Sequence, residues 1–306
     1  EFRRVLFRSD DDPATVLGPL PGRERAVPTH DGGTINTVEV GDPAAPAIVL
    51  AHGVTLSNRV WVRQLAALPG RGFRVIAYEH RGHGDSSVGA DGHSIDNLAL
   101  DLGAVLEAFD LHDAIVVGHS MGGVAAQAYA ITHPDAARDR LRGMVLLSSL
   151  AYTPFGSRTT QLKERLARVT DRVPDSRRIW ESDDLGIALA RIGFGHRPRP
   201  SHVELVRRMM VDCPPDTRRD APAQLVGLDL LEGLPEVAVP TLVVCGTADV
   251  ITPPSESRRM ANLIPGARLE LLRGGGHMLM LEQADAVDEL VVAFAREVGA
   301  APRAAA

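Results

Sequence analysis

The chain has 306 residues, of which 44% are hydrophobic and 24% are charged, and its formal net charge is −6. This length and composition allow one large domain with a sizeable buried core. Charges of both signs are scattered and form no basic block, so we expect no nucleic-acid partner, and no apolar run approaches the roughly 20 residues of a membrane span. The two cysteines, Cys213 and Cys245, give no disulfide framework.

The two ends of the chain are predicted to be unstructured, over residues 1–22 and 300–306. Residues 1–9, EFRRVLFRS, resemble the translation of a sequencing-library adapter, so we expect the natural sequence to begin near Asp10. Residues 10–21 are rich in aspartate and proline, and the tail is rich in alanine. The sequence contains no signal-peptide pattern, and we expect a cytoplasmic protein.

From residue 23 onward, apolar strand-like runs alternate with helical patterns, which predicts a mostly parallel sheet covered by helices on both faces. The first two strands are expected to form an antiparallel edge. The predicted strands are Arg25–Pro28, Ile35–Val40, Ala47–Ala51, Arg74–Tyr78, Ala114–Gly118, Met144–Ser148, Thr241–Cys245 and Arg268–Leu272. The predicted helices outside the middle of the chain are Val60–Leu68, Ile95–Phe109, Met121–His133, Glu256–Leu263 and Ala284–Val298.

The segment AIVVGHSMGG, residues 114–123, has the pattern of a buried strand, a tight turn at Ser120 and the start of a helix. A serine presented on such a turn adopts a strained backbone conformation, so its neighbours must be small, as Gly118 and Gly122 are. Ligands of open α/β sheets bind beyond the carboxyl ends of the strands, where this turn is placed. The pattern predicts that Ser120 is a nucleophile.

A serine hydroxyl needs a base to take its proton and a third group to orient that base. Asp249 follows the predicted strand Thr241–Cys245, and His277 stands in a glycine-rich loop after the last strand. Asp229 is a rival acid, but it falls inside a predicted helix. The sequence therefore predicts a catalytic triad in the chain order Ser120, Asp249, His277.

On these motifs the chain resembles the capped, esterase- and lipase-like serine hydrolases of the α/β-hydrolase fold, over roughly residues 23–298 apart from a variable middle. The resemblance implies that His52 and Gly53 open a loop that supplies the amide of Val54 to an oxyanion hole, with the amide of Met121 as the second donor. In YEHRGHGDSS, Glu79 stands where the family more often has aspartate, which we interpret as a structural variation.

The strand pattern stops between residues 150 and 234, where the family carries a helical cap. We therefore expect a core of residues 23–149 and 235–299 and a cap of residues 150–234. Ser201 and Glu204 have the spacing of a capping box at the start of one cap helix. The predicted helices of this region are Thr160–Val169, Asp183–Ile192, Ser201–Asp212 and Arg218–Leu231.

The walls of the substrate pocket are expected to come from a small pool of side chains, each of which has packing between cap and core as its alternative role. His196 and His202 lie in the expected cap and are expected to be exposed, with contact to the substrate as the alternative. His52, His80 and His83 are expected to brace the loops. No histidine or cysteine grouping has metal-ligand spacing, so we expect neither a metal nor a cofactor. The pocket candidates are His52, Tyr152, Phe155, Trp180, Phe194, Met209 and Met210.

These residue types predict a hydrolase that cleaves a small or medium carboxylic ester through an acyl-serine intermediate, with a small-molecule acyl substrate as its partner. Carbon–carbon bond hydrolases, lactonases, thioesterases and perhydrolases have the same triad and remain alternatives. A receptor that binds a small molecule without turnover is an alternative from another class.

Overall fold

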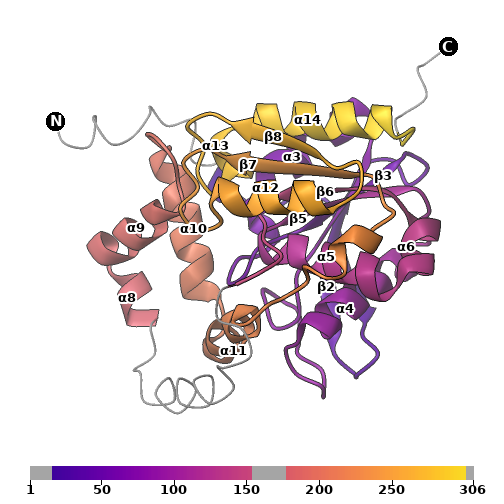
Figure 1. The fold of residues 1–306 in the computed structure, drawn as a ribbon. Helices are drawn as coiled ribbons and strands as arrows, with labels where there is room; N and C mark the ends of the chain where they lie inside the picture. The colour runs from indigo at the N-terminus through magenta and orange to yellow at the C-terminus, as the bar shows by residue number, and fades with distance from the viewer. Residues whose placement is uncertain (1–15, 154–176, 301–306) are drawn as a thin grey trace.

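The computed structural model describes residues 16–153 and 177–300 (Figure 1). The strands are β1 Arg23–Pro28, β2 Thr34–Val40, β3 Ala47–Ala51, β4 Arg74–Tyr78, β5 Ala114–His119, β6 Leu141–Leu147, β7 Thr241–Gly246 and β8 Arg268–Leu272. The α-helices are α3 Val62–Ala67, α4 Ile95–Ala108, α5 Met121–Thr132, α6 Pro134–Arg140, α8 Arg177–Glu181, α9 Asp183–Ile192, α10 Pro200–Asp212, α11 Pro215–Leu225, α12 Pro254–Leu263, α13 Leu279–Glu282 and α14 Ala284–Glu297. The 3-10 turns in the described residues are η1 Asn58–Trp61, η2 Pro69–Arg71 and η4 Leu234–Glu236.

The eight strands form one sheet in the order β1-β2-β4-β3-β5-β6-β7-β8. β1 pairs antiparallel with β2, and β2 pairs antiparallel with β4, whereas the remaining neighbours are parallel. The predicted α/β sheet with an antiparallel edge is therefore confirmed. Every residue of β3, β5 and β7 is buried, as expected for central strands that are covered on both faces.

Alternate residues of the central strands β3 to β7 belong to two different hydrophobic clusters, one on each face of the sheet. In β5, Ile115 and Val117 pack in the cluster that also contains residues of α3 and α14. Ala114 and Val116 pack in the other cluster, with residues of α4 and α5. Figure 1 shows the sheet running between these helices. The core thus consists of two apolar layers that hold the strand ends in fixed register.

The order of the strands reverses beside β3, because the chain passes from β3 to β4 on one side and to β5 on the other. At such a switch point the connections leave the two carboxyl ends in opposite directions and open a crevice between them. The loop after β3 and the turn after β5 flank this crevice, so the topology brings Gly53 close to Ser120.

Several predicted ends of helices and strands differ from the observed ends by a few residues. The predicted helix Val60–Leu68 is divided into η1 and α3, and β6 begins at Leu141 rather than Met144. The helix α6 was not predicted, because its polar sequence PDAARDR buries only Ala137 and has no apolar stripe.

The segment before β1 is more ordered than its composition predicts. Val16 is fully buried in one hydrophobic cluster, and the Arg59 side chain donates hydrogen bonds to the carbonyls of Leu17 and Gly18. At the other end, Ala300 is buried and donates its N–H to Ala295. The expected unstructured ends are therefore wrong for residues 16–22 and for Ala300, because tertiary contacts order them; the rest of both ends lies outside the described residues.

The helices α8 to α11 are inserted between β6 and β7, at the position expected for the variable region. One side of the inserted helices is continuous with the apolar core through Ala190, Val203, Val206 and Met209. The predicted helix Thr160–Val169 lies outside the described residues.

Two details of the inserted helices differ from the predictions. Helix α10 begins at Pro200 with Arg199 as its N-cap, so Ser201 lies inside the helix and the predicted capping box is wrong. Proline is favoured at the first helical position, and Glu204 instead pairs with two arginines on the following turn. The predicted helix Arg218–Leu231 ends at Leu225, which leaves Asp229 exposed outside any helix.

Candidate active site

Ser120 lies between β5 and α5 with a left-handed backbone, at φ 51° and ψ −116°. The turn is so tight that a Cβ atom at Gly118 would lie 2.4 Å from the carbonyl oxygen of Gly122, and one at Gly122 would lie 2.2 Å from that of Ala51. Only glycine fits at these two positions. A positive φ at a serine costs energy and persists only where the surrounding structure imposes it, which is typical of functional sites.

Asp249 and His277 meet beyond the ends of β7 and β8. His277 Nδ1 lies 3.0 Å from Asp249 Oδ2, and both side chains are almost fully buried. The other carboxylate oxygen, Oδ1, accepts the N–H groups of Ile251 and Thr252, each at 2.9 Å. Burial would raise the pKa of Asp249, but the hydrogen bonds from His277 and Thr252 outweigh it and hold the pKa below its ordinary value. The ionised carboxylate therefore accepts, and His277 Nδ1 carries the proton.

His119 links the serine turn to His277. Its Nε2–H donates to the carbonyl of His277 at 3.0 Å, and the two imidazole rings are 4.6 Å apart. Burial, followed by the proximity of His277, keeps the pKa of His119 well below its ordinary value, so this ring is neutral. Among the described residues the Ser120 hydroxyl forms no hydrogen bond. Catalytic hydrogen bonds are often completed only when substrate is bound.

The loop after β3 is held close to the serine turn. Thr55 has a positive φ of 59°, and its N–H donates to His83 Nε2 at 3.0 Å. Within the described parts of the chain, the N–H of Val54 donates no hydrogen bond. Met121 is the first residue of α5, where backbone N–H groups have no partner in the preceding turn of the helix. Both predicted oxyanion donors are thus placed with N–H groups that are not committed elsewhere in the fold.

His52 does not line a pocket, and that prediction is wrong. It is fully buried, its Nδ1–H donates to the carbonyl of Gly53, and its Nε2 accepts the N–H of His80. The rings of His52, His80 and His83 pack edge to face. Burial lowers the pKa of His80 to about 3 and that of His83 to about 4, so these rings act as neutral braces of the loops, as the sequence predicts for all three.

The turn after β4 is braced by a buried charged network. The Arg81 guanidinium is fully buried and donates two hydrogen bonds to Asp101, at 2.8 Å each, and one to Asp31 at 3.0 Å. Glu79 accepts the N–H groups of Asn58 and Asp85, so its carboxylate holds two neighbouring loops together. This arrangement supports the interpretation of Glu79 as a structural variation.

The candidate pocket residues separate into two groups. Met210 reaches the loop after β3, where its sulfur accepts a hydrogen bond from Thr55 Oγ1 at 2.9 Å. Phe194 is buried beside the loop that carries His277. The N–H groups of His277 and Met278 in this loop both donate to the carbonyl of Gly193, the residue before Phe194.

For the other candidates within the described residues, the packing and ring interactions found do not involve Ser120, Asp249 or His277. Met209 is buried in the apolar core, and Trp180 packs against that core from the inserted helices. Tyr152 forms an isolated bridge with Asp229 and lies under the Arg259 guanidinium. Phe155 lies outside the described residues.

A basic cavity of about 320 Å³ lies beside the loop that carries His277, lined by His196, Arg199, His202, Arg273 and Glu282 among others. His196 is exposed, as expected, but His202 is buried, so the exposure predicted for it is wrong. Its place on the inward side of α10, beside Val203 and Val206, explains this burial.

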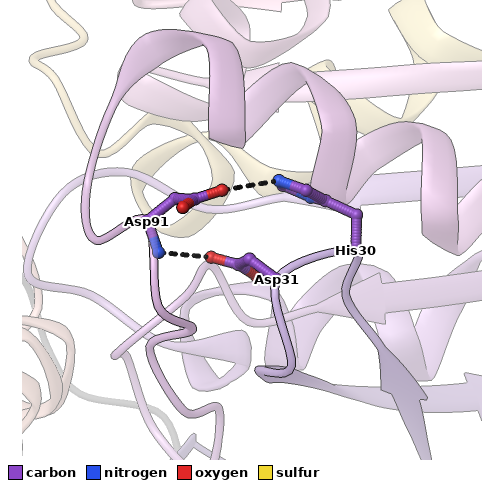
Figure 2. Close-up of side chains that lie close together, drawn as sticks. All are labelled: His30, Asp31 and Asp91. Carbon is purple, nitrogen blue, oxygen red and sulfur yellow. Dashed lines mark hydrogen bonds and ion pairs between the residues drawn. The ribbon is translucent and has the colours of Figure 1, made fainter.

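Figure 2 shows the one grouping of the described residues whose ligand atoms lie close enough for a metal ion, namely His30, Asp31 and Asp91. Asp91 pairs with His30, and its N–H donates to Asp31. The Asp31 carboxylate also accepts hydrogen bonds from Thr29 and Arg81. These hydrogen bonds and the ion pair explain why the three side chains lie together, since they join two loops.

The sequence did not identify Thr252 as a residue of the site, and it did not identify the partner of His83. Thr252 contacts both Asp249 and His277, and His83 holds the loop after β3. The run Thr252-Pro253-Pro254, which begins three residues after Asp249, was the available signal, because proline restricts the residue before it to an extended backbone. Nothing in the spacing of His83 connects it to Thr55, which is 28 residues away in the chain.

The site and the fold can be compared with known proteins. A family model described as alpha/beta hydrolase fold matches residues 46–284. The chain is 30% identical to a non-heme chloroperoxidase of Burkholderia pyrrocinia, over 88% of this chain and 98% of that protein. It is also 30% identical to a bifunctional esterase/perhydrolase of Acinetobacter calcoaceticus, over 88% and 99%. Among solved structures, a hydrolase of Pseudomonas aeruginosa superposes with a TM-score of 0.75 at 27% identity, over 89% of this chain and 98% of that one.

Proposed function

Because the chain belongs to the α/β-hydrolase-fold family, in which its relatives are hydrolases and esterases, we propose that it is a serine hydrolase of small or medium carboxylic esters. The observation that carries the proposal is the serine with positive φ at the carboxyl end of β5, beside a buried Asp249–His277 pair. A strained backbone at a serine and a histidine held in one orientation both cost free energy, and a turn with a purely structural role requires neither.

The proposed reaction begins when His277 Nε2 takes the hydroxyl proton of Ser120. The serine oxygen attacks the ester carbonyl, and the backbone N–H groups of Val54 and Met121 stabilise the oxyanion that forms. Each such donor contributes about 3 kcal/mol in comparable enzymes. Asp249 fixes the tautomer of His277 and stabilises the imidazolium.

The tetrahedral intermediate then collapses. The His277 imidazolium gives its proton to the leaving alkoxide, the carbon–oxygen bond of the ester breaks, and an acyl-serine remains. Water enters, loses a proton to His277 and attacks the acyl carbonyl. The acid leaves with return of the proton to Ser120, so the enzyme is regenerated without a cofactor.

We further propose that residues 150–234 act as a cap on a core of residues 23–149 and 235–299. Met210 of α10 contacts Thr55 in the loop that carries the proposed oxyanion donor Val54. Phe194 packs beside the loop that carries His277. The inserted segment therefore contacts both the loop after β3 and the loop that carries His277, which supports a role for it in selecting the acyl group.

Perhydrolysis is the second candidate function, and the similarity to a bifunctional esterase/perhydrolase favours it. The acyl-serine would react with hydrogen peroxide in place of water, so that a peroxy acid leaves and Ser120 is regenerated. This reaction needs the same triad and no redox change at the protein.

The test combines a fluorophosphonate probe with p-nitrophenyl esters from acetate to palmitate, using the wild type and Ser120→Ala. We expect Ser120 to be labelled and hydrolysis to peak at one chain length. Ser120→Ala should lower kcat/KM by about 10³ to 10⁶-fold with an unchanged melting temperature. Addition of hydrogen peroxide to the acetate ester, with titration of peracetic acid, measures the second candidate.

Comparable hydrolysis by Ser120→Ala would refute the assignment of the nucleophile. Labelling of Ser120 without turnover of any ester would refute the ester hydrolase and favour the carbon–carbon hydrolase or the receptor that the sequence left open.

A further inference from the structure

The side chain of Thr252 lies at the centre of the Asp249–His277 pair. Its hydroxyl oxygen is 2.8 Å from Asp249 Oδ2, 3.1 Å from His277 Nδ1 and 2.9 Å from the carbonyl oxygen of Ser148. Thr252 is 2% exposed, so no bulk water competes for these contacts. One hydroxyl thus joins the ends of β6, β7 and β8.

The number of protons at this junction limits what the hydroxyl can do. A hydroxyl has one proton and two lone pairs, whereas the Ser148 carbonyl and the Asp249 carboxylate can only accept. The Thr252 proton therefore points at one of these two oxygens and away from His277. His277 Nδ1–H already donates to Asp249, and the oxygen of Thr252 is left facing the same N–H as a second acceptor.

We propose, on the basis of the function proposed above, that Thr252 is a positioning residue whose hydroxyl oxygen stabilises the imidazolium of His277 together with Asp249. The negative end of the hydroxyl dipole faces the ring, so it favours the ring more when the ring is charged. The transition state contains this imidazolium, and Thr252 thus increases kcat without touching the substrate.

The backbone around Thr252 fixes its side chain in this place. Threonine is restricted at χ1 by its branched Cβ, and Pro253 restricts the Thr252 backbone to extended conformations. The Thr252 N–H donates to Asp249 Oδ1, so the same residue holds both oxygens of the carboxylate. Orientation of the carboxylate and of the ring is therefore set before substrate arrives.

Other titratable groups near His277 respond to pH independently of Thr252. His119 of β5 is neutral for the reason given above, and Asp249 is ionised. Glu282 of α13 accepts the N–H of Gly276, beside His277, and burial raises the pKa of its carboxyl. No hydrogen bond joins Thr252 to Glu282 or His119 among the described residues. Besides Asp249 and His277, the Thr252 hydroxyl contacts only the backbone carbonyl of Ser148 there, which does not titrate.

The test compares Thr252→Val, which keeps the shape but removes the hydroxyl, with Thr252→Ser, which keeps the hydroxyl. Thr241→Val is the matched control, because Thr241 is equally buried and its hydroxyl donates to the carbonyl of Val239 at the far end of β7. We expect Thr252→Val to lower kcat about tenfold with little change in KM. The acid limb of its kcat/KM profile should move to lower pH, since the imidazolium loses an acceptor. Thr252→Ser should restore both, and Thr241→Val should change neither.

A second readout does not depend on activity. The His277 Nδ1 proton, assigned by ¹⁵N-histidine labelling, should resonate at low field in the wild type and in Thr252→Ser and should shift in Thr252→Val. If Thr252→Val does not fold, Thr252→Ala serves in its place. An unchanged proton shift, or an unchanged pH profile in a variant that hydrolyses esters normally, would overturn the role of Thr252 while leaving the ester hydrolase intact. Absence of hydrolysis in the wild type would instead count against the proposed function.

Discussion

The central sheet and the inserted helices differ in how deeply their charged side chains are buried. At the carboxyl edge of the sheet, the side chains of Arg81 and Asp101 are both 0% exposed and are joined by two hydrogen bonds. On α10, Glu204 and Arg207 pair with exposures of 22% and 14%, and Arg208, which also pairs with Glu204, is more exposed still. The sheet fixes polar groups where they hold loops in place, whereas the insertion keeps its ion pairs near solvent.

This difference in burial agrees with the separate roles that we propose for the sheet and for the inserted helices. The groups that we propose to hold the reacting geometry, Asp249 and His277 with the braces of the loop after β3, lie at the buried carboxyl edge of the sheet. The inserted helices reach that edge through a few side chains, such as Met210. We infer that changes at the buried edge affect stability and chemistry, whereas changes in the insertion affect selectivity.

The largest effect is expected from the buried ion pair. Arg81→Met leaves the Asp101 carboxyl buried without its partner. Burial already raises the pKa of this carboxyl, so in the variant it either stays charged without compensation or takes up a proton, and the free energy of unfolding should fall by about 3–5 kcal/mol. Glu204→Gln is the matched control, because its partly exposed pairs with two arginines should contribute less than about 1 kcal/mol. Urea unfolding of both variants measures the contrast. If the two variants lose similar free energies of unfolding, the ion pair at the edge of the sheet contributes no more to stability than the ion pairs of the insertion.

Asp288 of α14 is another buried carboxyl of the core, and we expect it to make stability depend on pH. It accepts a hydrogen bond from Gln64 at 2.9 Å, but burial raises its pKa from 3.8 to about 6. The folded state thus binds the proton more tightly than the unfolded state, and the free energy of unfolding falls as pH rises from about 3.8 to about 6.

Asp288→Asn should remove this dependence and stabilise the protein at pH 8 by about 1–2 kcal/mol, with little difference at pH 4. Urea unfolding across this range is the measurement. A difference between wild type and variant that stays constant with pH would contradict the raised pKa of Asp288.

The smallest effect is expected in the insertion. Met210→Ala removes the side chain that contacts Thr55, so we expect the preferred acyl chain to become longer while kcat/KM for the best ester changes less than about tenfold. Met209→Ala is the control on the same helix, because Met209 is buried in the apolar core and its truncation should cost about 2–5 kcal/mol of stability without changing the preferred chain. An identical ester profile for wild type and Met210→Ala would separate the insertion from acyl selection.

Local patterns were sufficient to predict most of the sheet. Continuous apolar runs between turn residues gave Ala47–Ala51, Arg74–Tyr78 and Arg268–Leu272 with their observed bounds. The serine turn could be predicted because Gly118 is required by its contact with Gly122 in the same turn, although Gly122 is required by Ala51 of the neighbouring strand β3. Ends of helices in the insertion were less predictable, because proline and arginine near Ser201 compete with its capping signal.

The parallel sheet, the turn at Ser120 and the chain order of Ser120, Asp249 and His277 follow from local sequence patterns, because apolar periodicity and glycine placement act over short stretches of chain. By contrast, the fold as a whole makes His52 a brace rather than a pocket wall, buries Val16 in the core and brings Thr252 into contact with both Asp249 and His277. These roles depend on contacts between strand ends that are distant in the chain. Such contacts are set by how the strands are ordered in the sheet, and no local pattern records that order.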